Sequence, residues 1–189
     1  MRGKRFVVLS LALVLGLLMV VAAAGSLSSR PAPALRWDLV SIVQGTVVAG
    51  GEDTATDAAT GDVVTLTGSG QATPAAADAA GGGTFVHRHA NGAAVAHGVY
   101  MVIRFISWKP SPGTLPIPDA IGHVEQASSG IVTLRVRFFP DGGSPVEGTL
   151  TVNCDLPGAT FPITEGVTVA VGPFSFVQSG GATLFHVFS

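Results

Sequence analysis

The chain has little with which to cross-link itself. Cys154 is the single cysteine among 189 residues, so no disulfide can form within the chain. A lone thiol can pair between chains in an exported protein. Its place in an alternating apolar run instead predicts a small buried side chain. Packing alone must therefore hold the fold together.

Long segments without glycine or proline are also missing. The chain has 25 Gly and 12 Pro, and beyond residue 24 no stretch free of both exceeds 11 residues. An average globular helix takes ~11–12 residues, whereas a strand takes only ~5–6. The sequence therefore favours many strands and few helices.

Motifs that identify a reaction are lacking as well. The sequence contains no Gly-x-Ser-x-Gly nucleophile elbow and no His-Glu-x-x-His zinc motif. Serine hydrolases of the elbow type and metalloproteases of the zincin type are recognised by these patterns. The sequence does not decide whether the chain is an enzyme, and the lack of these motifs favours a protein without catalytic activity. No cofactor follows from the sequence, apart from the transition metal considered below.

What the sequence does have is an N-terminal export pattern. Arg2, Lys4 and Arg5 precede an uncharged, mainly apolar run over residues 6–24, which ends in three alanines. This order is typical of a secretory signal peptide, here residues 1–24. The run also approaches the ~20 residues that cross a bilayer as a helix, so an uncleaved N-terminal membrane anchor is the alternative. We expect a secreted, extracellular protein.

Basic residues are scarce in the chain without its predicted signal peptide. Removal of the signal peptide leaves seven basic and twelve acidic residues, a formal charge of −5. Binding to nucleic acid requires an excess of basic charge that displaces counterions, and adsorption to anionic lipid requires basic clusters. We therefore predict no nucleic-acid partner and no membrane contact after cleavage.

Alternating apolar and polar residues mark the expected strands. Within residues 131–139, Val132, Leu134, Val136 and Phe138 share one face. A Pro-Asp-Gly-Gly turn follows at residues 140–143, so residues 131–156 are predicted to form a hairpin. About nine strands at short spacing, without long helices between them, predict an all-β fold. We expect an antiparallel β-sandwich or a jelly-roll-like barrel.

The expected organisation is simple. A flexible leader over residues 25–35 precedes a single β-rich domain over residues 36–189. A domain of this size buries a hydrophobic core without disulfides. The Ala/Gly-rich segment near residues 71–83 is predicted to be a mobile loop within it.

Several short strings together resemble a family of uncharacterised exported bacterial β-rich proteins with no assigned activity. They are WDLVSI (37–42), TLTGSG (65–70), GGGTF (81–85), ISW (106–108) and LFHV (184–187). These are turn and strand patterns of low specificity. The resemblance implies a secreted β-rich domain and no functional residue.

A His-x-His pair is the best candidate for chemistry. Residues two apart in a strand point the same way, so His87 and His89 could bind one metal. Gly81 precedes them at the spacing that opens the metal motif of cupins, which the segment resembles, but the acidic ligand expected after the second histidine is missing. His97, across a turn at residues 91–92, could replace it, and three histidines would suit zinc, copper or iron. The alternative is a hairpin whose histidines face solvent.

Other polar or aromatic groups suggest weaker sites. Trp37 and Trp108 lie at strand ends and could stack on a sugar, although core packing is the commoner use of such rings. Arg104, Arg135 and Arg137 could receive an anionic ligand or form an ordinary solvated face.

An acidic cluster precedes the expected loop region. Glu52, Asp53, Asp57 and Asp62 offer carboxylates to calcium, but their spacing does not match a calcium-binding loop. The sequence as a whole favours a non-catalytic extracellular binding or structural module, whose partner is an unknown protein or glycan. The alternative is a cupin-like metal-binding protein or metal-dependent enzyme that uses the His-x-His strand.

Overall fold

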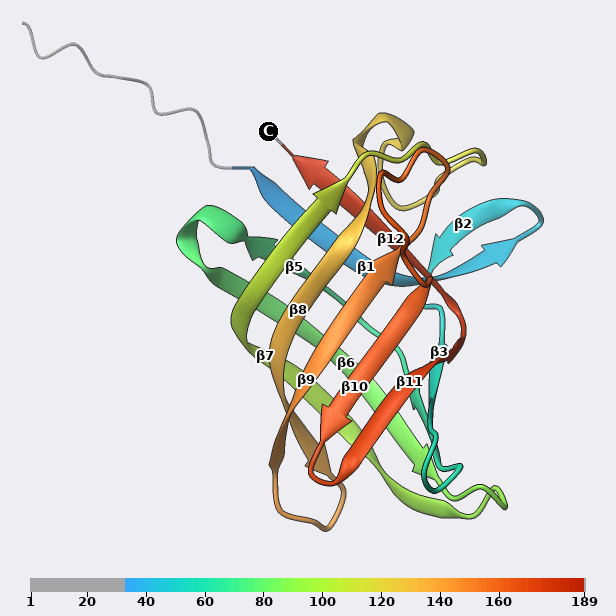
Figure 1. Ribbon diagram of the computed structural model, residues 1–189, viewed down its shortest axis with the longest axis vertical. Coiled ribbons are helices and arrows are strands. Elements are labelled where there is room, and N and C mark those ends of the chain that lie inside the picture. Colours follow the sequence, from blue (N-terminus) through green and yellow to red (C-terminus); the bar gives the residue numbers. More distant parts are fainter. Residues whose placement is uncertain (1–32, 189) are drawn as a thin grey trace, which may run out of the picture.

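The computed structural model describes residues 33–188, which form twelve strands and two short 3-10 helices (Figure 1). The predicted signal peptide and most of the predicted leader lie outside the described residues. In the described part, no helix has the length and apolar character needed to cross a membrane. The strands are β1 (Ala34–Val43), β2 (Thr46–Ala49), β3 (Asp53–Asp57), β4 (Val63–Leu66), β5 (Ser69–Thr73), β6 (Asp78–Arg88), β7 (Ala94–Ser111), β8 (Ala127–Pro140), β9 (Val146–Cys154), β10 (Gly166–Val171), β11 (Phe174–Gly180) and β12 (Ala182–Phe188). The helices are η1 (Pro74–Ala76) and η2 (Val124–Gln126).

All strands belong to one antiparallel sheet. Its order is β12-β1-β5-β6-β4-β3-β11-β10-β9-β8-β7, and β12 also pairs with β8, which closes a ring through ten strands. β7 pairs with both β6 and β8, and β2 pairs only with β1. Because β7 bridges two members of the ring, the sheet is not a regular barrel. The all-β antiparallel class is confirmed. The twelve strands form one sheet that closes into a ring, whereas we expected a sandwich or a jelly-roll-like barrel of about nine strands.

The hairpin predicted over residues 131–156 is confirmed. β8 and β9 pair in register, with Val132 opposite Val152 and Leu134 opposite Leu150. All four of these side chains are buried. Period-2 alternation places them on the inner face of the ring, where they form the centre of the core.

The Ala/Gly-rich segment near residues 71–83 is not a loop. Its residues form the antiparallel pair β5 and β6, which η1 connects. Bare backbone is required here because Trp37, fully buried on β1, packs against it. A Cβ on Gly70 would lie 2.7 Å from the indole ring, and a Cβ on Gly81 (φ +140) would lie 3.0 Å from it. Glycine thus serves close packing at this position instead of flexibility.

Cys154 ends β9 inside the core. Its thiol is free and fully buried, and burial raises its pKa to about 12. The predicted role as a small buried side chain is confirmed. A thiol this deep is largely protonated at neutral pH, so it is a poor nucleophile.

The long connection between β7 and β8 is fastened to β12 by a buried hydrogen bond between a carboxylate and an imidazole. The Asp119 carboxylate lies 2.7 Å from Nε2 of His186, and both side chains are fully buried. Asp119 also accepts hydrogen bonds from the backbone N–H groups of Ile121 and Gly122. This pair holds the connection over one end of the ring.

We expect the glycine contact with Trp37 to be sensitive to a single methyl group. In Gly70→Ala the new Cβ meets the Ala80 carbonyl oxygen at 2.3 Å as well as the indole ring. Overpacking of this kind costs ~1–3 kcal/mol. Gly92→Ala is the control, because its Cβ meets nothing and only its positive φ is strained, at roughly 1 kcal/mol. Urea denaturation should show a larger decrease in the free energy of unfolding for Gly70→Ala than for Gly92→Ala. Equal decreases would contradict the packing role.

Asp53 is a buried carboxyl at the start of β3. One oxygen accepts a hydrogen bond from the Ala182 N–H at 2.9 Å, and the other has no partner in the described chain. Burial, together with the nearby Glu165, raises the pKa of Asp53 to about 7, although the Ala182 hydrogen bond acts in the opposite direction. The folded protein therefore favours the protonated acid.

This raised pKa predicts a pH-dependent stability. Between about pH 4 and pH 7 the unfolded chain loses the Asp53 proton before the folded chain does, so stability falls as pH rises through this window. In Asp53→Asn that loss should be smaller by a few kcal/mol, on the order of the pKa difference. Thermal unfolding from pH 4 to pH 8 measures it, with the exposed Asp78→Asn as the control. If Asp53→Asn follows the wild-type profile, the buried acid is ionised throughout.

Candidate functional site

An apolar cavity is lined by residues near the end of the ring where the β6–β7, β8–β9 and β10–β11 hairpins turn. These turns lie at the bottom of Figure 1. Its volume is about 200 Å³. Four phenylalanines contribute to the wall, and His87 is its single ionisable side chain. The lining residues are Val64, Phe85, His87, Ala96, Phe138, Pro140, Val146, Val169, Val171, Gly172, Pro173, Phe174 and Phe176.

The position of His87 follows from the alternation along β6. Phe85 and His87 point to the inside of the ring, whereas Arg88 is exposed. The His87 side chain is only 11% exposed. Its ring meets Phe174 and Phe176 edge-on, with centroids 5.1 and 5.3 Å away. A polar ring is therefore held among aromatic side chains, where an unpaired polar atom is costly.

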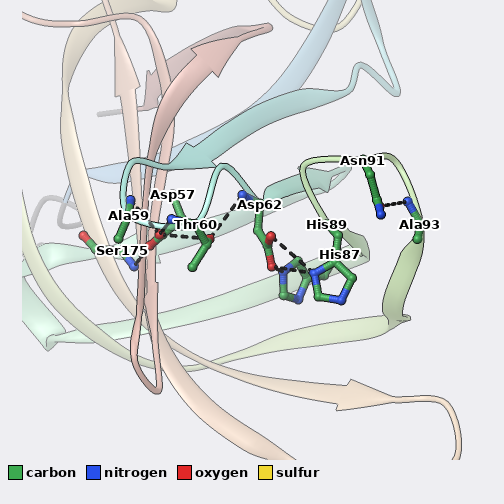
Figure 2. Close-up of polar contacts among 9 residues, drawn as sticks. All are labelled: Asp57, Ala59, Thr60, Asp62, His87, His89, Asn91, Ala93 and Ser175. Atoms are coloured by element: carbon green, nitrogen blue, oxygen red, sulfur yellow. Dashed lines mark hydrogen bonds and ion pairs between the residues drawn. The ribbon is translucent and has the colours of Figure 1, made fainter.

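Asp62 holds His87 in this place (Figure 2). One carboxylate oxygen lies 3.0 Å from Nε2 of His87 and 3.2 Å from Nδ1 of His89. His89 is more than half exposed, so it closes the pair off toward solvent. Nδ1 of His87 has no hydrogen-bond partner among residues 33–188. This nitrogen is therefore available to a ligand.

The turn before β4 places Asp62. Asp57 accepts hydrogen bonds from the backbone of Ala59 and Thr60 at 3.0 Å each, and the Thr60 hydroxyl accepts one from the Asp62 N–H at 3.2 Å. The other Asp57 oxygen accepts the Ser175 N–H of β11 at 2.8 Å (Figure 2). That hydrogen bond is the main reason why the pKa of Asp57 is lowered. The turn is therefore fixed to the strand that carries Phe174 and Phe176.

The electrostatics keep Asp62 ionised. Burial acts to raise its pKa, but the hydrogen bonds to His87 and His89 and the electrostatic interaction with both rings outweigh burial, and the pKa is lowered. A carboxylate bonded to one imidazole nitrogen fixes the tautomer and the orientation of the ring. The site can thus present a defined donor or acceptor to a molecule in the cavity.

The three histidines of the predicted metal site do not come together. His97 pairs with Val86 in the β6–β7 register, so it lies on the outer face, and its partner is Asp141 at 3.3 Å. A histidine opposite Val86 cannot share the inner face with His87, because neighbouring residues of a strand point to opposite sides. Among residues 33–188, no group of three or more His, Cys, Asp or Glu side chains is arranged to hold a metal.

The predicted aromatic site is not assembled either. Trp37 is fully buried in the core, so its ring has no free face for a sugar. Trp108 is partly buried against Phe185, with ring centroids 4.9 Å apart. The two indoles serve packing.

The predicted arginine group is brought together. Arg104 lies opposite Arg135 on the neighbouring strand, and Arg137 bonds to Glu147. The acidic cluster, in contrast, is dispersed. Asp53 enters the core, Asp57 builds a turn and Asp62 faces the histidines.

Sequence reasoning missed Asp62 as the partner of His87, and it missed Phe174 and Phe176 as the wall beside it. Asp62 lies 25 residues before His87, and no spacing rule joins them. The available signal was an acidic residue immediately before a strand that pairs with the His-x-His strand. That pairing cannot be known before the strand order.

Comparison with known proteins adds no relative: no family model, no curated protein and no solved structure matches this chain. The resemblance to exported bacterial β-rich proteins therefore stays a prediction. The function must be inferred from the geometry of the site.

Metal binding at the histidines can be tested directly. Because both imidazoles bond to one Asp62 oxygen, we expect Zn²⁺ to leave the melting temperature of the metal-stripped protein unchanged. A metal that binds only the folded form must raise it. A rise that His87→Ala or His89→Ala abolishes, and His97→Ala preserves, would support a metal site at these residues.

Proposed function

We propose that this protein is a non-catalytic extracellular binding module for a small, mainly apolar molecule that carries one hydrogen-bonding group. The observation behind this proposal is the half-open apolar cavity with a single oriented imidazole, His87, in its wall. Small-molecule sites are generally concave and apolar, with few polar groups that fix the orientation of the ligand.

The lining favours an aromatic or branched aliphatic ligand. Phe85 and Phe138 meet edge to face at 5.2 Å, while Phe174 and Phe176 stack at 5.5 Å. Aromatic pairs of this kind present both ring edges and ring faces to a guest. An apolar cavity of ~150 Å³ accepts benzene, so one of about 200 Å³ suits a substituted single ring.

His87 supplies selectivity for the polar group. A buried site that hydrogen-bonds a hydroxyl discriminates against the analogue without it, because the protein group would then stay unpaired. Asp62 keeps the imidazole in one orientation before the ligand arrives, which lowers the ordering cost of binding. A phenol or a similar alcohol therefore fits the site better than a hydrocarbon of the same shape.

Calorimetric titration with p-cresol and with toluene tests the proposal. We expect p-cresol to bind with a Kd between about 10 μM and 1 mM, the range for a ligand of this size. Toluene should bind at least about fivefold more weakly, which corresponds to roughly 1 kcal/mol for the hydrogen bond. In His87→Leu this preference should vanish while toluene still binds.

Two alanines on β7 provide the matched control. Ala96 lines the cavity, so Ala96→Phe should fill it and abolish binding of both compounds. Ala94 is exposed on the same strand, so Ala94→Phe should bind as the wild type does. If neither compound binds the wild type, or if Ala96→Phe binds them unchanged, the cavity is not a ligand site.

A further inference from the structure

Exposed apolar side chains gather on the outer face of β7. Eleven large apolar side chains are exposed in the described chain, and five of them belong to this strand: Val95, Val99, Met101, Ile103 and Ile106, each 40–54% exposed. Solvent-exposed sheet faces normally carry polar residues. A sheet face on which exposed apolar side chains gather marks an interaction surface. We call these five side chains the apolar stripe, which His97 interrupts between Val95 and Val99.

Two β-bulges create part of this stripe. The β7–β8 register shifts between Val102 and Arg104 and again between Phe105 and Ser107. Each shift inserts one residue, Ile103 in the first case and Ile106 in the second, and both are exposed. A bulge adds an outward side chain without disturbing the inward alternation. The two isoleucines are thus extra outward groups beside Arg104 and Ser107.

Cationic side chains border the stripe. Arg104 lies opposite Arg135, and Arg137 lies opposite Met101. These are three of the six Lys and Arg residues between positions 33 and 188. Glu147 offsets only one of them, and all three arginines together lower its pKa, with the Arg137 hydrogen bond as the main cause. In a chain of negative net charge, this face carries a local positive excess.

The chain enters the fold beside the same strand. Pro33 and Ala34 line a surface hollow together with Trp108 and Pro110, at the end of β7. The apolar run over residues 6–24 is separated from Pro33 by eight residues, which span less than about 30 Å even when extended. In the form of the protein that keeps residues 6–24 as an uncleaved membrane anchor, a bilayer that holds this run therefore lies within reach of this end of β7.

We propose that the outer face of β7 and β8 is a membrane-contact surface for anionic phospholipid. The arginines would bond to headgroup phosphates, and the apolar stripe would enter the interfacial region beside them. Phosphate suits guanidinium groups because they bind it bidentately. A second copy of the chain is disfavoured as the occupant, since a twofold contact would oppose these arginines to one another. Addition of a strand is excluded because both edges of β7 are already paired.

A nitroxide label reports the contact in the full chain. Met101→Cys carries the label on the stripe, and Val177→Cys carries it on the outer face of β11, where the side chain is equally exposed (54% and 53%). Cys154 stays unlabelled because it is buried. The full chain is reconstituted in phosphatidylcholine vesicles with and without phosphatidylglycerol. Collisions of each label with an aqueous nickel chelate are then measured by electron paramagnetic resonance.

We expect at least a threefold loss of nickel accessibility at position 101 in phosphatidylglycerol vesicles, and none at position 177. Arg104→Glu with Arg135→Glu should restore access at position 101, while near-ultraviolet circular dichroism confirms the fold. The proposal is overturned if both labels stay equally accessible, or if position 101 is equally protected without anionic lipid. Protection that disappears when the protein-to-lipid ratio is lowered would assign the face to a second copy instead.

Discussion

The contact between Trp37 and the bare backbone of β5 and β6 is the constraint on which the closed sheet depends. A ring through ten strands must bring β1 against β5 while β6 continues to β4. The indole fills the space inside this junction, and only residues without a Cβ leave room for it at Gly70 and Gly81. A larger side chain at either position would clash with the indole and push β1 away from β5 and β6.

The ligand cavity and this junction are linked through β6. The first half of the strand carries Gly81 and pairs with β5, whereas the second half carries His87 and pairs with β4. The junction end is filled with large side chains, so the core there is closed. At the other end the hairpin turns leave space between the phenylalanines, and Asp62 fixes the single polar ring that enters it. One strand thus carries both a glycine packed against Trp37 and the histidine in the cavity wall.

Several carboxylates of this protein are buried, whereas the arginines of β7 and β8 lie on the outer face of the ring. Buried carboxylates, among them Asp57, Asp62 and Asp119, each accept hydrogen bonds from a turn or from histidine, so they fasten connections to strands. The arginines of β7 and β8 lie on the outer face instead. The net charge of the chain is negative, and it therefore predicts no affinity for anionic lipid. It is a sum over buried carboxylates and exposed arginines, so it does not describe the charge of one face. A surface interaction responds to the local field, which falls off within a Debye length of ~8–10 Å.

The sequence by itself determined the all-β antiparallel class, the hairpin of β8 and β9 and the burial of Cys154. Each rests on local alternation between neighbouring residues, which every strand repeats independently of its partners. Tertiary structure alone decided the strand order, the ordered pairing of the Ala/Gly-rich segment and the side of the sheet that each histidine occupies. These features depend on contacts between residues far apart in the chain. His87 and His97 illustrate the reason: both lie on predicted strands, but only the register between β6 and β7 sends one inward to Asp62 and the other outward to Asp141.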